Sequence, residues 1–199
     1  DIQFEFPFGF KELEGIHSRT DFDLKSHQEL SGKKLTYFDQ EKNEAYVPYV
    51  VETSIGADRM FLAMLSNNLK EESVPDSKGE DSTRLVFKIH PALAPVKCAV
   101  LPLVKNKEEL TSKAKTIYDK LKLQFQCQYD DKDAIGRRYR RQDAIGTPIC
   151  ITVDFETLDD NCVTVRDRDT LVQQRVPIEK LSAIIAEKTD MSKVLDQLV

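Results

Sequence analysis

The chain has 199 residues, of which 40% are hydrophobic and 32% are charged, and its formal net charge at pH 7 is −5. This composition fits a globular protein of one or two small domains. It excludes a disordered or collagen-like chain, and no apolar run approaches the roughly 20 residues of a membrane span. The acidic balance argues against indiscriminate binding to DNA or RNA, which depends on many neutralised phosphates, and the lack of a visible signal peptide leads us to expect a cytoplasmic protein.

The first part of the chain is expected to contain strands that lead into one helix. Residues 9–16 alternate polar and apolar side chains, and residues 46–52 are rich in Val and Tyr, as half-buried strands are. Apolar side chains then recur near helical spacing over residues 56–69, which predicts that a strand feeds directly into a helix. Residues 70–81 offer almost nothing apolar to bury, so we predict a solvated linker there.

The second part of the chain alternates strands with helices. Residues 96–104 form a continuous apolar run, as in a central strand covered on both faces, and residues 107–123 follow with helical periodicity. Further strands are expected at residues 125–129, 148–154, 162–166 and 171–176, and further helices at residues 134–145 and 178–187. This order predicts an α/β fold with a mixed sheet in residues 91–199, preceded by a separate smaller domain in residues 1–90.

The cysteines and histidines do not follow the spacing of a metal site. The four cysteines are widely spaced among apolar or β-branched residues, which predicts reduced, buried thiols; they are Cys98, Cys127, Cys150 and Cys162. The three histidines are scattered along the chain, at His17, His27 and His90. We therefore expect no protein-held metal of this kind.

Residues 52–59 form the first segment that could carry chemistry. They place Glu52 at a strand end, Gly56 at the turn and Arg59 within the first turn of the following helix. Free N–H groups at the start of a helix, beside a guanidinium, suit an anionic ligand such as a phosphate. The alternative is that Gly56 only permits the turn and that Arg59 is a solvated helix residue.

Glu12 and Glu14 form a second candidate, because side chains two residues apart lie on the same face of a strand. Two acids on one face suit a magnesium ion, an ammonium group or simply solvent. Asp21 and Asp23 follow closely and extend the acidic neighbourhood, which Arg19 interrupts.

Residues 137–141 concentrate positive charge in an otherwise acidic chain. Four arginines surround Tyr139, and such a patch can neutralise phosphates while a ring or a guanidinium plane stacks on an unpaired RNA base. The alternative is a helix held by internal salt bridges to Asp131, Asp133 and Asp143. Residues 166–169 alternate Arg and Asp, and they either read base edges or pair with one another.

Six strings in order extend these local patterns over nearly the whole chain. They are ELEGI at residues 12–16, RTDFDL at 19–24, PYVVE at 48–52, HPALAP at 90–95, IGRRYRRQD at 135–143 and VTVRDRDT at 163–170. Together they resemble the dimeric type of glycyl-tRNA synthetase, a class II enzyme. The resemblance implies the end of an antiparallel-sheet catalytic domain in residues 1–90, with motif 3 at residues 52–59, and an anticodon-binding domain in residues 91–199.

The resemblance also assigns roles to single residues. It implies catalytic roles for Arg59, which would hold the ATP phosphates, and for Glu12, which would lie at the ATP site with magnesium. The ATP-binding set would be Glu12, Leu13, Gly56, Ala57, Asp58 and Arg59. The glycine-binding set would be Glu52, Thr53, Ser54, Ile55 and Gly56. The tRNA-binding set would be Arg137, Arg138, Arg140, Arg141, Arg166 and Arg168.

The activity implied is that of a glycine–tRNA ligase: glycine attacks ATP to give glycyl-adenylate, and the glycyl group is then transferred to tRNA(Gly). The family works as a homodimer, whereas motifs 1 and 2 are missing from this sequence, and Thr53 stands where proline is familiar. We therefore expect part of a longer enzyme that is inactive by itself. Two alternatives remain: a non-catalytic RNA-binding accessory protein derived from such an enzyme, and a nucleotide-binding regulator unrelated to tRNA.

Overall fold

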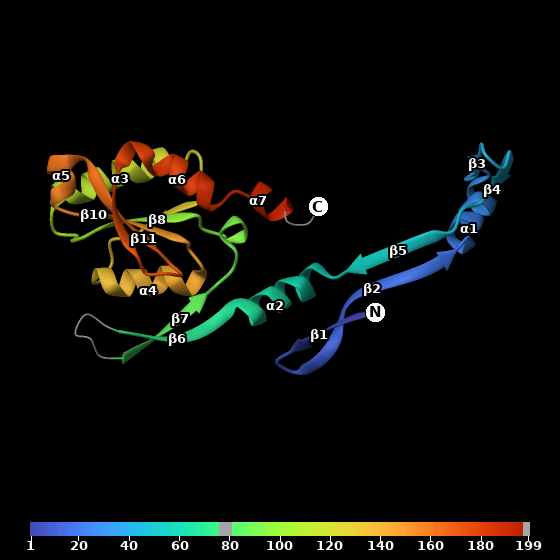
Figure 1. Ribbon diagram of the computed structural model, residues 1–199, viewed down its shortest axis with the longest axis horizontal. Helices are drawn as coiled ribbons and strands as arrows, with labels where there is room; N and C mark the ends of the chain where they lie inside the picture. The colour runs from blue at the N-terminus through green and yellow to red at the C-terminus, as the bar shows by residue number, and fades with distance from the viewer. Residues whose placement is uncertain (76–80, 197–199) are drawn as a thin grey trace. The chain divides into compact units, whose positions relative to one another are not determined.

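A computed structural model of the chain describes residues 1–75 and 81–196 (Figure 1). The chain divides into two compact units, Asp1–Asn67 and Asn68–Val199. No helix in the described residues combines the length and the apolar character that crossing a membrane requires.

The first unit is built on a three-stranded antiparallel sheet with strand order β1-β2-β5. Its elements are β1 (Ile2–Phe6), β2 (Gly9–Thr20), α1 (Phe22–Ser31), β3 (Tyr37–Asp39), β4 (Glu44–Tyr46), β5 (Val50–Ile55) and α2 (Ala57–Asn68). The predicted strand at residues 9–16 is confirmed and runs on to Thr20, and the predicted helix after Gly56 is confirmed as α2. The strand predicted at residues 46–52 is displaced, because residues 47–49 connect β4 to β5.

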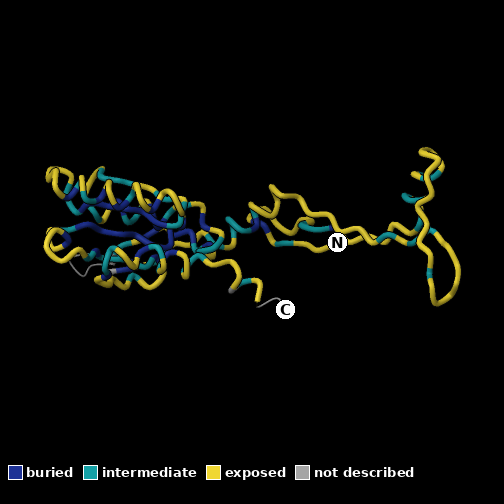
Figure 2. The backbone as a smooth tube through the Cα atoms, turned by 90° about the horizontal axis from the view of Figure 1, so that it is seen from above, coloured by how far each residue is buried: buried dark blue, intermediate teal, exposed yellow. Residues whose placement is uncertain are grey.

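This first unit buries very little apolar surface. Of its hydrophobic residues, all of which the structure describes, only Phe6 and Ala63 are buried. Large apolar side chains such as Phe8, Phe10 and Phe61 are each more than 60% exposed. Figure 2 shows the contrast with the second unit: the backbone around the N-terminus is mostly exposed, whereas the central strands of the other unit are buried.

The second unit contains a five-stranded mixed sheet with strand order β12-β11-β10-β8-β9. β8 runs parallel to both β9 and β10, whereas β11 runs antiparallel to β10 and β12. The strands are β8 (Cys98–Pro102), β9 (Cys127–Tyr129), β10 (Ile149–Val153), β11 (Cys162–Asp167) and β12 (Gln173–Pro177). The helices are η1 (Pro91–Leu93), α3 (Glu108–Leu121), α4 (Ile135–Ile145), α5 (Glu156–Asp160), η2 (Ile178–Lys180), α6 (Leu181–Lys188) and α7 (Ser192–Leu195). The predicted mixed sheet and its alternating helices are confirmed.

Helices cover both faces of this sheet, as Figure 1 shows: α3 and α6 lie on one side and α4 on the other. Alternate residues of β8 pack against opposite faces of the sheet. Cys98 and Val100 lie under α3, whereas Ala99 and Leu101 lie under α4. All four cysteines are free thiols; Cys98 and Cys150 are buried as expected, whereas Cys127 and Cys162 are only partly buried.

The linker predicted at residues 70–81 is wrong for its first part. Residues 70–75 belong to β6 (Leu69–Pro75), which pairs with β7 (Asp81–Phe87), and residues 76–80 lie outside the described residues. Composition misled because Glu72 of this hairpin is paired rather than solvated: it accepts two hydrogen bonds from the buried Arg84. The expected domain boundary at residue 90 therefore falls inside the second compact unit.

We predict that a polypeptide of residues 68–199 folds alone, whereas residues 1–67 do not, because only the second unit has a layered core. Circular dichroism of the two separate polypeptides against urea checks this. A sigmoidal transition is expected for the second unit and a featureless slope for the first. A cooperative transition in residues 1–67, or none in residues 68–199, would contradict the division.

Candidate functional site

The first unit contains an open hollow of about 560 Å³ where β2 approaches the junction of β5 and α2. Its lining consists of Glu12, Leu13, Ser54, Ile55, Gly56, Ala57, Asp58 and Arg59. All six residues that the resemblance assigned to ATP are in this set. Residues more than 40 positions apart in sequence are thus brought together by the pairing of β2 with β5.

Local structure explains how Arg59 reaches this hollow. β5 ends at Ile55, the chain turns at Gly56, and α2 starts at Ala57, so Arg59 lies in the first turn of the helix. Its Nη1 donates a hydrogen bond of 2.6 Å to the backbone carbonyl of Glu12. A guanidinium has five N–H donors, so this bond fixes the side chain and leaves donors for an anion beside the positive end of the helix.

The residues assigned to glycine are not gathered around one cavity. In an antiparallel pair, residues directly opposite each other share a face of the sheet. Glu52, opposite His17, and Ser54, opposite Gly15, lie on one face of the sheet. Thr53, opposite Ile16, and Ile55, opposite Glu14, lie on the other. Of the assigned set, Ser54, Ile55 and Gly56 line the hollow, but Glu52 and Thr53 do not.

Glu52 lies instead beside Arg19, with its Oε2 3.6 Å from the Nε of Arg19. Arg19 also donates two hydrogen bonds, of 2.8 and 2.9 Å, to the carboxylate of Asp23. This hydrogen bonding holds the pKa of Asp23 below its usual value. The acidic neighbourhood noted in the sequence is therefore partly neutralised by the arginine within it.

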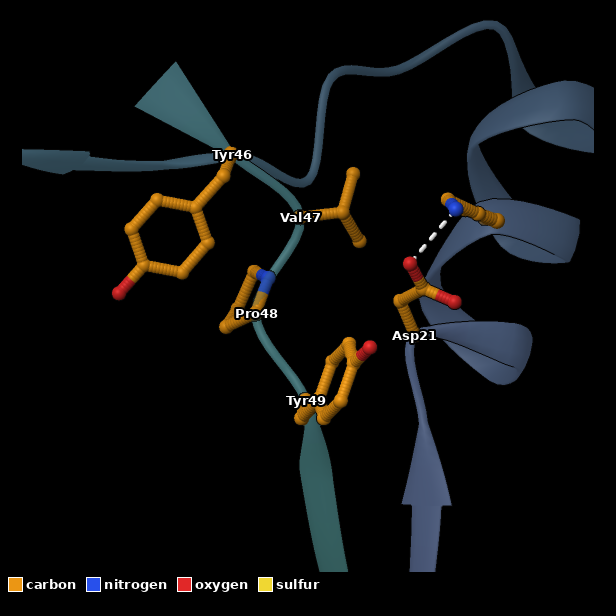
Figure 3. Close-up of a pocket in the computed structure, with 6 residues that line it drawn as sticks. Asp21, Tyr46, Val47, Pro48 and Tyr49 are labelled. Atoms are coloured by element: carbon orange, nitrogen blue, oxygen red, sulfur yellow. Dashed lines mark ion pairs between the residues drawn. The ribbon is translucent and has the colours of Figure 1, made fainter. Parts of the chain in front are cut away.

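A second hollow of about 650 Å³ in the first unit contains none of the assigned residues. Asp21, Lys25 and the segment from Tyr46 to Tyr49 line it, and Lys25 forms an ion pair of 2.6 Å with Asp21. Figure 3 shows Val47 and Tyr49 directed toward this pair, whereas Tyr46 points away. The sequence interpretation placed residues 46–49 in a strand and gave no sign of a hollow.

Three of the six arginines assigned to tRNA are buried, and the expectation that they face RNA is therefore wrong. Arg138, Arg166 and Arg168 are 1%, 6% and 2% exposed. Arg138 donates to the backbone carbonyls of Pro102 and Leu103. Arg168 donates to the carbonyls of Phe87 and Gly146 and pairs with Asp169. Their positive charges hold the fold together and are not available at the surface.

Asp143 is the centre of a buried charge network that joins α4, β7 and β11. Its carboxylate, which is fully buried, accepts hydrogen bonds of 2.8 and 2.9 Å from Arg166 and one of 3.1 Å from Arg84. Arg84 also binds Glu72, which pairs in turn with Lys88. The sequence left open that Asp143 pairs with the arginines of its own helix and that Arg166 pairs within residues 166–169. In the structure Asp143 pairs instead with Arg84 and Arg166.

The other three assigned arginines lie on α4 at i, i+3 and i+4 spacing, which places Arg137, Arg140 and Arg141 along one side of the helix. Arg137 is exposed, and the structure records no partner for it within residues 1–75 and 81–196. Arg140 donates to the hydroxyl of Ser82, and Arg141 pairs with Asp130 and Asp133. The Arg141–Asp133 pair is exposed on both sides, and such pairs are weak enough for a phosphate to compete with them.

Both units of the chain resemble known proteins in sequence. Residues 97–188 match the family model described as anticodon binding domain. The glycine–tRNA ligase of Agathobacter rectalis is 54% identical over 188 residues, which cover 94% of this chain and 40% of that protein. Those of Alkaliphilus metalliredigens and Clostridium perfringens are 55% and 53% identical, over 94% and 96% of this chain. The chain spans about two fifths of the length of these curated relatives.

Proposed function

Because this chain is a sequence relative of the glycine–tRNA ligases over 94% of its length and carries an anticodon binding domain, we propose that it is part of an enzyme that joins glycine to tRNA(Gly). The resemblance found in the sequence is confirmed at the level of this family. The observation that most supports a catalytic role is the hollow in which Glu12 and Arg59 meet.

In this proposal the hollow binds ATP, and Arg59 holds its phosphates. Arg59 is fixed through the carbonyl of Glu12, so its remaining donors are oriented before the nucleotide arrives. Glu12 and Asp58 line the same hollow, and a magnesium ion bound to ATP is usually held by one or two carboxylates together with phosphates and waters. The residues present therefore fit ATP with magnesium, which would supply further positive charge.

For glycine, the proposal retains Glu52, Ser54 and Gly56. Thr53 lies on the opposite face of the sheet and outside the hollow, whereas Ile55, on the same face as Thr53, borders the hollow proposed for ATP. Glu52 would pair with the ammonium group. Gly15 lies opposite Ser54, and a Cβ added there would come within 2.4 Å of the Nε2 of His17. The exposed imidazole of His17 thus occupies the space over Gly15, on the face of the sheet that also carries Glu52 and Ser54.

Catalytic activity is proposed for the longer enzyme and not for this chain alone. The relatives are more than twice as long as the aligned region, and the first unit leaves most of its apolar side chains exposed. A homodimeric state and a cytoplasmic location of the longer enzyme remain predictions from the resemblance and from the composition.

The anticodon arm of tRNA(Gly) is proposed to bind at the exposed side of α4 that carries Arg137, Arg140 and Arg141. A lost phosphate contact should lower the slope of log Kd against log salt by about 0.7 for single-stranded RNA. We therefore expect Arg137→Ala and Arg141→Ala to weaken binding of tRNA(Gly), with a shallower salt dependence. Fluorescence anisotropy with labelled tRNA(Gly), and with an anticodon-swapped tRNA, measures both quantities.

Lys120→Ala is the matched control, because Lys120 is exposed on α3, which covers the other face of the sheet. It should bind both RNAs as the parent does. If the α4 variants also bind both RNAs as the parent does across the salt series, the RNA surface lies elsewhere. If the parent chain does not prefer tRNA(Gly) over the swapped RNA, the proposed anticodon reading fails.

A further inference from the structure

Two of the four cysteines lie side by side in the sheet of the second unit. The register of the parallel strands β8 and β9 pairs Cys98 directly with Cys127, and their Sγ atoms are 3.4 Å apart. Both belong to the layer under α3. Cys150 packs on the opposite face, and the Sγ of Cys162 lies 3.5 Å from the carbonyl oxygen of Asp160. The pair is therefore a local feature of two strands and does not reflect a general clustering of thiols.

The two thiols differ in accessibility and in hydrogen bonding. Cys98 is fully buried and donates its S–H to the Sγ of Cys127. This hydrogen bond, together with burial, raises the pKa of Cys98 far above its usual value. Cys127 is partly exposed on β9, a three-residue strand at the edge of the sheet. A small reagent therefore meets Cys127 first, while Cys98 is held beneath it as a protonated thiol.

We propose that Cys98 and Cys127 form an oxidation-sensitive dithiol that closes to a disulfide when a small peroxide reaches Cys127. The Cys127 thiolate attacks one oxygen of hydrogen peroxide, the O–O bond breaks, and the departing hydroxide takes up the thiol proton as water. The product is a sulfenic acid on Cys127. The sulfur of Cys98 then displaces the hydroxyl group, which leaves as water with the proton of Cys98. Two thiols and one peroxide give one disulfide and two waters.

The structure permits this bond with a small movement. A disulfide requires the two sulfurs to approach to about 2.05 Å, and paired strands already bring their backbones within the usual range. β9 is short and has a neighbour on one side only, so it can shift toward β8. The cross-link would enclose α3 in a closed loop, and it should raise the Tm of the second unit by limiting the unfolded chain.

The test treats the chain with hydrogen peroxide, alkylates the remaining thiols under denaturing conditions and maps the peptides by mass spectrometry. We expect a product two hydrogens lighter, with the Cys98 and Cys127 peptides joined and with Cys150 and Cys162 alkylated. A thiol reductant should restore all four thiols. Cys127→Ala should abolish the product. Cys162→Ala removes another partly buried thiol, whose contact is the carbonyl oxygen of Asp160, and it should leave the product unchanged.

Cys98→Ala gives a second readout: a sulfenic acid should accumulate on Cys127 and be trapped by a cyclic 1,3-diketone. Equal oxidation of all four cysteines, or disulfides only between chains, would overturn the proposal. So would an unlinked sulfinic acid as the first product of the parent chain. The parent chain itself shows whether the disulfide between Cys98 and Cys127 forms, so the experiment tests the proposal even if the Cys98→Ala variant does not fold.

Discussion

Asp143→Ala is expected to lower the free energy of unfolding of the second unit by about 3–5 kcal/mol, because it removes one partner from a buried ion pair network. Arg84 and Arg166, which are 2% and 6% exposed, would lose the carboxylate that they share. Arg166 would keep its position above the ring of Tyr139, 4.7 Å from the ring centre. Arg84 would keep its ion pair with Glu72, whereas Arg166 has no second carboxylate among its partners in the described residues.

Urea denaturation of residues 68–199, followed by circular dichroism, measures this loss. Asp133→Asn is the control, since it removes the charge of a carboxylate that pairs with Arg141 and is 48% exposed, and Asn tolerates the left-handed backbone of this position. The control should cost less than about 1 kcal/mol. If the two variants lose the same stability, the Asp143 network contributes no more than a surface ion pair.

Arg59→Ala, in the longer enzyme that the relatives represent, is expected to reduce ATP–pyrophosphate exchange about ten- to a hundredfold or more. The variant removes charge-assisted hydrogen bonds to phosphate that are worth about 1.5–3 kcal/mol each. It also removes the bond that ties the start of α2 to the carbonyl of Glu12. Initial rates at varied ATP and varied glycine separate the effects, since Glu52→Gln should instead raise the KM for glycine.

Lys25→Ala is a suitable control, because Lys25 pairs with Asp21 in the other hollow of the same unit, to which no step of the reaction is assigned. It should leave the exchange rate near that of the parent. If the Arg59→Ala variant exchanges pyrophosphate at the rate of the parent, this hollow is not the ATP site. Equal losses in all three variants would indicate damage to the first unit as a whole.

Much of the second unit could be predicted from the sequence because its periodic signals are strong. The apolar run around Val100 and the amphipathic pattern of α3 each indicate one structure only, and both were confirmed. α1 was missed because it buries none of its residues, so no apolar period marks it. β6 was missed in part because its Glu72 is paired with Arg84 and Lys88, while rules based on composition treat every charge as solvated.

The candidate sites divide in the same way. The meeting of Glu12 with Arg59 came from the resemblance and agrees with the geometry, but no local pattern could place residues of β2 beside α2. The split of Glu52 from Thr53 follows from strand alternation once the register is known. Burial of Arg166 could not be read from the sequence, since its partner Asp143 is 23 positions away on another element.

The arginines of the second unit also differ in whether they should tolerate substitution by lysine. Arg84 makes four hydrogen bonds to three partners, Glu72, Asp143 and the carbonyl of Arg168, and only a planar fork with several donors can span them. A lysine would retain the charge at this position but lose the shape. At Arg137, which has no recorded partner in the described residues, an ammonium group would serve a phosphate almost as well. The same conservative exchange should therefore be harmless on the surface of α4 and disruptive beneath it.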